Sequence, residues 1–472
     1  MLDGSAEWCH WCHVMEATTY SDAEVRQVLD AHFIAVKVDV DTRPDLLERY
    51  GDWGFPATIV FDPDAEEVAK YRGFIEPKRF AEVLREIATQ GKKGQLPADP
   101  TPEPGQRVHG AEKFALLREV VQDALDDRFD EQEGGWGTGQ KAPIGVNNAW
   151  LLRRAFRGDQ VARQQVLFTL DKQAALLDPV WGGIYQYSAA SDWNHPHFEK
   201  LLTFQAPALE NYAQAFKLGN DQAHKARAVS LRGYIDRFLR AEDGAFYVTQ
   251  DADLHAHDHD APFMDGHAYY ALPEAERLRH GIPRVDKGVY GFQNGLGIAA
   301  YVTVFEALGD RTALEAAKRA SARVQRSHVG PSGALSHDGE KDPKRYFLAD
   351  NAAFGFALLR LYQHTQAPED IALAERIAAF LDRELWDPST GAFFVSTVDP
   401  DAAGVFARRR LGFEENVMAV RFLSLLHKSR PNARTRRLAL TALSAITTLP
   451  QIKARGRWLG DLLLALDDAK DL

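Results

Sequence analysis

The sequence contains only two cysteines, and they lie three residues apart in the string Trp8-Cys9-His10-Trp11-Cys12. A pair with this spacing can exchange disulfides with another molecule if a helix begins at the first cysteine. The unpaired N–H groups at the helix start would stabilise an attacking Cys9 thiolate, and Cys12, one turn later, would resolve the mixed disulfide. A protonated His10 would favour that thiolate further and make the pair more oxidising. We therefore predict a redox-active dithiol.

Three other interpretations of these residues stay open. Residues 9–13 also spell Cys-x-x-Cys-His, the attachment string for haem c, although such proteins are usually exported. Zinc could be held by Cys9, His10, Cys12 and His13 if both histidines turned inward from the same short segment. Cysteine is also often a small buried apolar residue without chemistry. A strand that runs into a helix at this point favours the redox interpretation, so we assign no metal and no cofactor.

The segment around the dithiol has the pattern of one small α/β unit, which we place at residues 1–90. The strand that leads into the dithiol is expected within residues 1–6. Other elements are predicted from alternating β-branched residues, from helical spacing of apolar residues and from a Ser-Asp cap. The predicted helices are 21–32 and 78–89, and the predicted strands are 33–39, 57–61 and 67–71.

A proline-rich linker at residues 91–107 separates this unit from a second domain at residues 108–472. In the second domain, long helical segments alternate with short turns in which glycine precedes an aromatic or apolar residue. The glycines at 135, 183, 244, 333 and 391 are spaced by 48, 61, 89 and 58 residues. Most of these spacings fit two helices and their loops, and the longest could hold a further helix pair. We expect a closed or nearly closed ring of helical hairpins, with an open helical array as the alternative.

Several polar and aromatic residues near these turns are candidates to line a cavity in the second domain. The candidate ligand-binding residues are Trp136, His197, Glu199, Asp251 and Asp253. Paired carboxylates could act as general acid and base on a sugar, and aromatic rings could stack on sugar faces. The aromatic residues considered for stacking are Trp136, Trp181, Tyr185 and Trp193. The alternative is that the turns merely seat the hairpins.

A strip of alternating histidines and aspartates spans residues 253–260, with histidines at 255, 257 and 259. These are metal-ligand types. The same alternation is typical of a solvated loop, which we favour here.

The entry to the dithiol resembles that of thioredoxins. In that family a buried acidic residue six positions before the first cysteine relays a proton from the resolving thiol, and Asp3 matches it. The family also has a cis-proline that faces the dithiol, and Gly54-Phe55-Pro56 stands at the corresponding place. The resemblance implies catalytic roles for Cys9, Cys12, Asp3 and Pro56. The strand and helix that precede the active-site strand in thioredoxins have no counterpart here, so we expect an N-terminally short version or a start codon placed late.

A closer resemblance covers nearly the whole chain. Residues 9–16 (CHWCHVME), 36–39 (VKVD), 134–137 (GGWG), 197–200 (HFEK) and 250–253 (QDAD) are similar to strings of the spermatogenesis-associated thioredoxin-like family. That family joins a thioredoxin-like domain to an (α/α)6 toroid like those of six-hairpin glycosidases and sugar epimerases. The resemblance therefore implies a thioredoxin-like α/β fold followed by an all-α toroid, but it implies no substrate.

Composition limits the classes of function. A net charge of −11 argues against nucleic acid as the main partner, because phosphate binding needs a basic face. We read no membrane span and no signal peptide, and therefore expect a cytoplasmic protein. The first hypothesis is a thiol–disulfide protein that acts on a protein thiol or disulfide. A carbohydrate-active enzyme with a regulatory redox module is the second, and a binding protein with a vestigial cysteine pair is the third.

Overall fold

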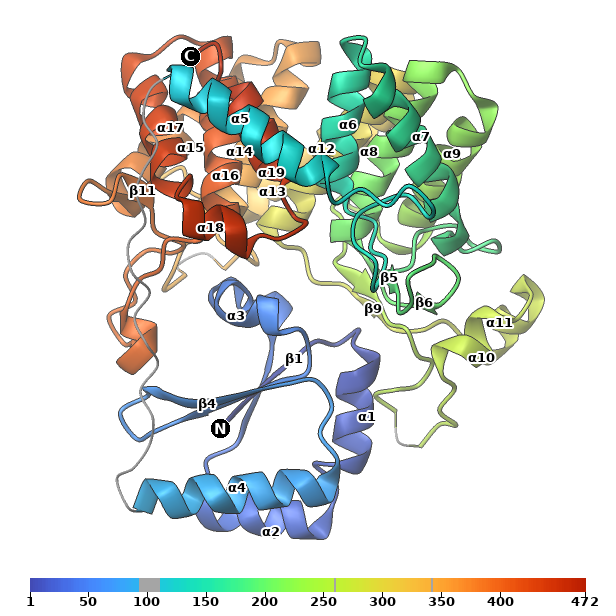
Figure 1. Ribbon diagram of the computed structural model, residues 1–472, viewed down its shortest axis with the longest axis vertical. Coiled ribbons are helices and arrows are strands. Elements are labelled where there is room, and N and C mark those ends of the chain that lie inside the picture. Colours follow the sequence, from blue (N-terminus) through green and yellow to red (C-terminus); the bar gives the residue numbers. More distant parts are fainter. Residues whose placement is uncertain (93–110, 259, 341–342) are drawn as a thin grey trace.

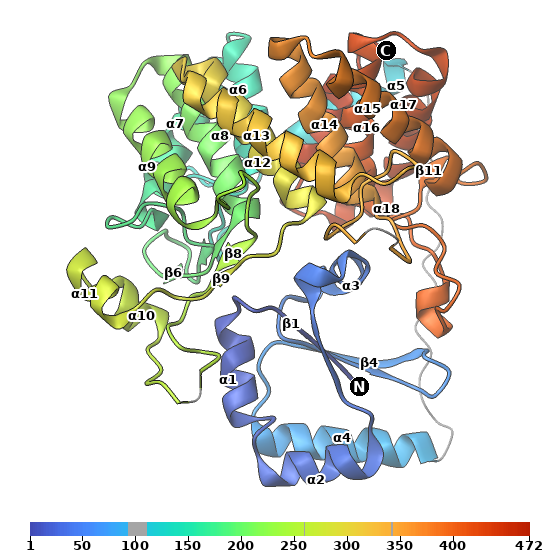
Figure 2. The same ribbon diagram turned by 180° about the vertical axis from the view of Figure 1, so that it is seen from behind.

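A computed structural model describes residues 1–92, 111–258, 260–340 and 343–472. The expectation of an α/β unit followed by a helical toroid is confirmed (Figures 1 and 2). Most of the predicted linker lies outside the described residues, and the domain boundaries stay predictions. Within the described part of the chain, no helix combines the length and hydrophobicity required to cross a membrane.

The first unit is a four-stranded mixed sheet in the order β2-β1-β3-β4. Strand β1 runs parallel to β2 and antiparallel to β3, and β3 pairs antiparallel with β4. The strands are β1 (Leu2–Ser5), β2 (Val36–Asp39), β3 (Ala57–Phe61) and β4 (Glu67–Arg72). The helices are α1 (His10–Thr18), α2 (Ala23–His32), α3 (Pro44–Tyr50) and α4 (Pro77–Lys92), with short 3-10 turns at Val40–Thr42 and Gly51–Trp53.

Alternation along β3 gives each face of the sheet its own core. Val60 faces the cluster made with α2 and α4, whereas Ala57 and Ile59 face α3. Phe406 of the helical domain packs onto this second cluster. One face of the small sheet is thus completed by a residue far along the chain.

Two predicted boundaries in this unit are corrected. The strand predicted at 33–39 begins only at Val36, because the Phe33 N–H still donates to the Leu29 carbonyl and closes α2. The helix predicted at 21–32 begins at Ala23, since Asp22 is the cap and accepts hydrogen bonds from the next turn.

The helical region is a closed double ring, so the open array is excluded for the described residues. Six inner helices pack in the cyclic order α6-α8-α12-α14-α16-α19 and back to α6. The inner helices are α6 (Gly145–Phe156), α8 (Leu202–Gly219), α12 (Gly291–Leu308), α14 (Leu348–Thr365), α16 (Phe413–Ser429) and α19 (Gly460–Asp468). The outer helices are α5 (Ala111–Asp126), α7 (Gln160–Gln173), α9 (Gln222–Phe238), α13 (Arg311–His328), α15 (Pro368–Phe380) and α17 (Ala433–Ile446). Helix α5 packs on α19, so the first and last helices of the toroid close the ring.

Short elements fill the loops at the end of the toroid that faces the small sheet (Figure 1). The short helices are α10 (Gly266–Tyr270), α11 (Glu274–His280) and α18 (Leu449–Ala454), with further turns at Ala174–Leu176, Leu381–Leu385 and Gly404–Ala407. The short strands are β5 (Tyr187–Ser188), β6 (Pro196–His197), β7 (Lys200–Leu201), β8 (Thr249–Gln250), β9 (Val285–Asp286), β10 (Trp386–Asp387) and β11 (Ala392–Phe393). Helices α10 and α11 lie within the longest spacing between the glycine turns.

The glycine turns are fastened to the inner helices by a repeated amide contact. Four inner helices carry a buried amide side chain as their fourth residue, and each amide donates to and accepts from one backbone unit shortly after a turn glycine. The pairs are Gln205 with Ile184, Asn294 with Phe246, Asn351 with Leu335 and Asn416 with Phe393, at 2.6–3.1 Å. At Gly183 a side chain is excluded, because a Cβ would lie 2.6 Å from the Tyr234 ring. The glycine turns therefore hold the helical hairpins in place.

Candidate functional site

The dithiol lies where β1 leads into α1. Cys9 caps the helix, and its sulfur accepts the Cys12 N–H at 3.2 Å. Cys9 and Cys12 are joined in a disulfide. The predicted helix start at the first cysteine is therefore confirmed, and the sulfur lies among the free N–H groups that favour a thiolate after reduction. In this oxidised state neither sulfur is available as a haem or zinc ligand.

The residues implied by the thioredoxin resemblance lie on β1, which leads to the disulfide, and in the loop before β3. The Phe55–Pro56 peptide bond is cis, as expected. Asp3 is 7% exposed, and burial raises its pKa to about 6. Trp8 donates through Nε1 to Asp41 Oδ2 at 2.7 Å, and its ring meets Phe55 edge to face. The proton-relay role of Asp3 and the docking role of Pro56 stay predictions.

The toroid covers the dithiol. Cys9 and Cys12 are only 4% and 5% exposed, and they share an apolar cluster with Leu201 and Phe204 of the toroid. Trp11, between the cysteines, is 43% exposed and leans on Phe74. A large thiol substrate therefore reaches the sulfurs only when the toroid side of this cluster moves.

The carboxylates predicted to line a toroid cavity lie instead against helix α1. Asp253 Oδ2 lies 2.8 Å from His10 Nδ1 and 3.3 Å from His13 Nδ1, and its other oxygen accepts the Gly266 N–H at 2.9 Å. Glu199 Oε1 accepts the main-chain N–H of His10 at 3.4 Å. The two groups of candidate residues, the dithiol and the toroid carboxylates, thus form one site.

The charges at this contact stabilise one another. Burial opposes ionisation of Asp253, but the neighbouring His10 and His13 lower its pKa to about 2. The hydrogen bond to Asp253 raises the pKa of His10. Pairing with the Asp253 carboxylate therefore favours the imidazolium form of His10, beside Cys9.

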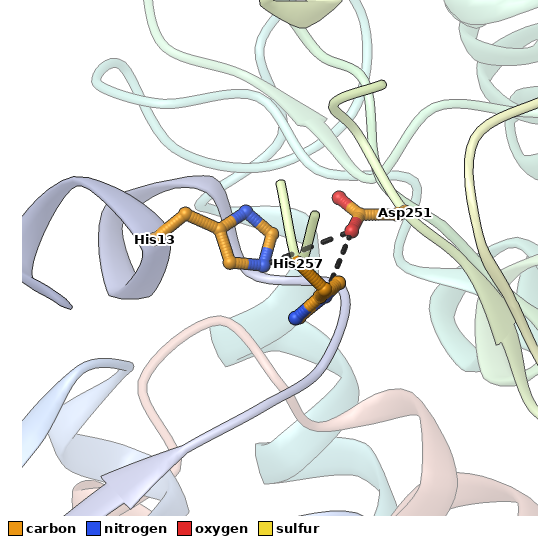
Figure 3. A group of neighbouring side chains, drawn as sticks. All are labelled: His13, Asp251 and His257. Carbon is orange, nitrogen blue, oxygen red and sulfur yellow. Dashed lines mark ion pairs between the residues drawn. The ribbon is translucent and has the colours of Figure 1, made fainter. Parts of the chain in front are cut away.

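A second group of side chains adjoins this one (Figure 3). His13, Asp251 and His257 each offer one ligand atom, and these atoms lie within 4.8 Å of one another. Asp251 Oδ2 lies 3.2 Å from His257 Nε2 and 3.7 Å from His13 Nε2. The carbonyl oxygen of Glu7 lies 2.9 Å from the first of these nitrogens and 3.1 Å from the second. Burial raises the pKa of Asp251, and contact with Asp251 raises the pKa of His257.

The histidine strip does not act as one unit. Of the described histidines in the strip, only His257 joins the group with His13. His255 Nδ1 turns instead to the Pro262 carbonyl at 3.1 Å. His259 lies outside the described residues. Sequence reasoning missed the partnership of His13 with His257 because the two lie far apart in the sequence and belong to different domains.

The remaining predicted ligand-binding residues are Trp136, which is buried, and His197, which is partly buried. Trp136 is buried against Phe129 and its carbonyl accepts from Arg457. His197 stacks on Tyr187, and its Nδ1 lies 3.9 Å from Glu199 Oε2. The other aromatic residues considered for sugar stacking are also buried: Trp181, Tyr185 and Trp193. Sugar binding by these residues stays a prediction that their burial does not support.

Further contacts attach the small domain on both flanks of the dithiol. His337 Nε2 lies 2.8 Å from the Asp41 carbonyl, and the other His337 nitrogen meets the buried Asp350 carboxylate. The flanking ion pairs are Glu7 with Arg284, Asp45 with Arg345, Glu48 with Arg410 and Glu66 with Arg408. The closed arrangement over the dithiol is therefore held at several separate points.

Comparison with known proteins follows the same division into two parts. Residues 1–89 match the family described as "Thioredox_DsbH: Protein of unknown function, DUF255". Human spermatogenesis-associated protein 20 is 24% identical over 83% of this chain, and the mouse protein is 29% identical over 52%. This chain is similar to human spermatogenesis-associated protein 20 over most of its length. The matches span 66% of the human relative and 35% of the mouse relative, so the chain covers less than two thirds of the length of either.

The chain also has more distant relatives. A thiol:disulfide interchange protein DsbD from Ralstonia nicotianae is 38% identical over 18% of this chain and 15% of its own length. A D-mannose isomerase structure has a TM-score of 0.59 at 10% identity, and covers 77% of this chain and 98% of its own. The cellobiose 2-epimerase of Bacillus thermoamylovorans gives a TM-score of 0.55 at 11% identity, covering 70% of this chain and 85% of its own. These structures establish the toroid fold.

Proposed function

We propose that this protein is a thiol–disulfide oxidoreductase whose Cys9–Cys12 pair exchanges with a protein thiol or disulfide. The observation that carries the proposal is Cys9 at the N-cap of α1 with its sulfur bonded to the Cys12 sulfur. A relative named thiol:disulfide interchange protein supports the same chemistry, and its match to this chain spans 89 residues. The proposed setting is the cytoplasm.

The exchange uses Cys9 and Cys12, with Asp3 as the proposed proton acceptor. In the direction that oxidises the protein, the Cys9 thiolate attacks one sulfur of a substrate disulfide and releases the first substrate thiolate. Cys12 then passes its proton to Asp3 and attacks the Cys9 sulfur, which releases the second substrate thiolate. The protein gains the Cys9–Cys12 disulfide and the substrate gains two electrons and, from solvent, two protons. Reduction of the protein follows the reverse path.

The toroid acts in this proposal as a cover with a docking surface. Leu201 and Phe204 lie against the sulfurs, and Asp253 and Glu199 bind the start of α1. A protein substrate must displace this cover before a sulfur of its own can approach Cys9 in line. The exposed Trp11 ring provides an apolar contact beside the dithiol during that approach.

A carbohydrate-active enzyme is the second candidate, and it is supported by the toroid fold shared with sugar epimerases and isomerases. The position of its candidate carboxylates does not favour it, because Glu199 and Asp253 contact helix α1. It predicts that a sugar raises the melting temperature of the Cys9→Ser variant but not that of Glu199→Gln. A sugar screen by thermal shift on these two variants tests it.

The redox proposal is tested by equilibrating the protein in glutathione buffers and reading the state of the thiols by intact mass. We expect a reversible loss of two hydrogens with one defined midpoint potential. The Cys12→Ser variant should accumulate a mixed disulfide with glutathione, and Cys9→Ser should react far more slowly. Absence of a Cys9–Cys12 disulfide in every buffer would refute the proposal.

A further inference from the structure

Four potential ligand atoms converge between the two domains, and Figure 3 shows the three side chains among them. They are Nε2 of His13, Nε2 of His257, Oδ2 of Asp251 and the main-chain carbonyl oxygen of Glu7. His13 and Glu7 come from the thioredoxin-like domain, whereas Asp251 and His257 come from the loop of the toroid after β8. The group therefore spans the domain interface.

The spacing of these atoms matches the edges of a small coordination tetrahedron. Metal–ligand bonds of zinc to nitrogen and oxygen imply ligand–ligand distances of about 3.3 Å. The distances from His257 Nε2 are 3.2 Å to Asp251 Oδ2 and 2.9 Å to Glu7 O. The distances from His13 Nε2 to the same two oxygens are 3.7 and 3.1 Å. Four of the six edges of such a tetrahedron are therefore close to the required length, and the three side-chain atoms all lie within 4.8 Å of one another.

Asp251 supplies the second, independent observation. It is 2% exposed, and its Oδ2 makes no hydrogen bond of good geometry among the described residues, although it lies 3.2 Å from His257 Nε2 and 3.7 Å from His13 Nε2. A buried carboxylate oxygen without a well-formed hydrogen bond is costly, and a bound cation would satisfy it.

The surrounding groups support ligation rather than compete with it. Asp253 Oδ2 lies 3.3 Å from His13 Nδ1, the carboxylate–histidine arrangement that orients metal-bound imidazoles. The Glu7 side chain is engaged by Arg284 at 2.5 Å, which leaves its main-chain carbonyl directed at the two histidines.

We propose that His13, His257, Asp251 and the Glu7 carbonyl form a zinc site that fastens the toroid loop over the dithiol. Two imidazoles, one carboxylate and one carbonyl are a nitrogen and oxygen ligand set that zinc accepts in tetrahedral geometry. The site needs neither cysteine, so it is distinct from a Cys-x-x-Cys zinc site and forms while the disulfide is intact. The proposal does not depend on the redox activity of the dithiol.

Zinc binding to the oxidised full chain tests this proposal, because the disulfide removes the sulfurs as ligands. Isothermal titration with zinc should give one equivalent bound. Asp251→Asn and His257→Ala should each weaken binding by about tenfold or more. The matched control is His255→Ala, in the same loop but turned to Pro262, and its affinity should equal that of the unaltered protein. X-ray absorption should show nitrogen and oxygen ligands, including imidazole, and no sulfur.

A second measurement tests whether zinc holds the toroid loop over the dithiol. Zinc should slow reduction of the disulfide by a small phosphine in the unaltered protein and in His255→Ala, but not in His257→Ala. The proposal is overturned if the oxidised protein binds no stoichiometric zinc, or if Asp251→Asn and His257→Ala bind it as tightly as the control. Zinc binding without redox cycling would uphold this site and refute the oxidoreductase.

Discussion

Asp253 Oδ2, in the toroid, lies 2.8 Å from Nδ1 of His10, the residue that follows Cys9 in the dithiol. This contact couples the charge beside the dithiol to the position of the second domain. The carboxylate that raises the pKa of the imidazole next to Cys9 thus belongs to the other domain.

Asp253→Asn is expected to lower the pKa of His10 towards its ordinary value, because the carboxylate is the main group that raises it. Titration of the His10 imidazole by NMR measures this shift. Asp258→Asn, an exposed change in the same loop, is the control. An unchanged His10 titration in Asp253→Asn would show that the two side chains are apart in solution.

Asp3→Asn is expected to slow the resolving step. Burial raises the pKa of Asp3 to about 6, so the carboxyl can take up and release a proton near neutral pH, which an amide cannot do. Resolution of the mixed disulfide by Cys12 should fall by about tenfold or more while attack by Cys9 is unchanged. Stopped-flow tryptophan fluorescence with oxidised glutathione separates the steps, and the exposed Asp30→Asn is the control.

Asp41→Asn is expected to stabilise the protein at alkaline pH. Burial and the nearby Asp39 raise the pKa of Asp41 to about 7 from an ordinary 3.8. The folded state therefore binds this proton more tightly than the unfolded state. The stability linked to the group is complete below pH 3.8 and is lost as the pH rises through 7.

The amide introduced by Asp41→Asn would still accept from Trp8 but would not ionise. We expect a gain in unfolding free energy on the order of 2–4 kcal/mol at about pH 8, and none below about pH 4. Thermal unfolding across this pH range measures it. An equal gain at both extremes would point to packing rather than to ionisation.

Asn351→Ala is expected to destabilise the toroid by about 2–4 kcal/mol, because it leaves the buried N–H and carbonyl of Leu335 without partners. Denaturant unfolding measures the loss. Asn351→Asp can still accept from the N–H but cannot donate to the carbonyl, so an intermediate loss is expected. The exposed Gln222→Ala is the control.

Helices and strands could be predicted from the sequence where the pattern of apolar residues matches the side chains that are buried in the structure. The run 57–61 alternates between two buried faces, and β3 has those bounds. Cys9 was predicted to begin a helix because a Cys-x-x-Cys motif that follows a strand is typical of a dithiol at a helix N-terminus. The start of β2 was placed too early because the apolar Phe33 closes α2 instead of entering the sheet.

The site itself could be predicted only in parts. Glu199, Asp251 and Asp253 were singled out for their chemistry, but no local pattern indicates that they contact α1 from so far along the chain. The pairing of His13 with His257 depends on the interface between the two domains. The contacts at that interface come from isolated residues, so no periodic pattern in the sequence indicates them. The amide contacts of Asn351 and its counterparts recur at the same helix position, so a search for that repeat could have found them.

Closure of the ring by α5 and α19 sets an order of events during synthesis. The thioredoxin-like domain leaves the ribosome first and has its sheet and helices complete before the toroid exists. Residues 460–468 must emerge before the ring can close. A nascent chain therefore presents Cys9 and Cys12 to the surrounding redox buffer until translation reaches α19.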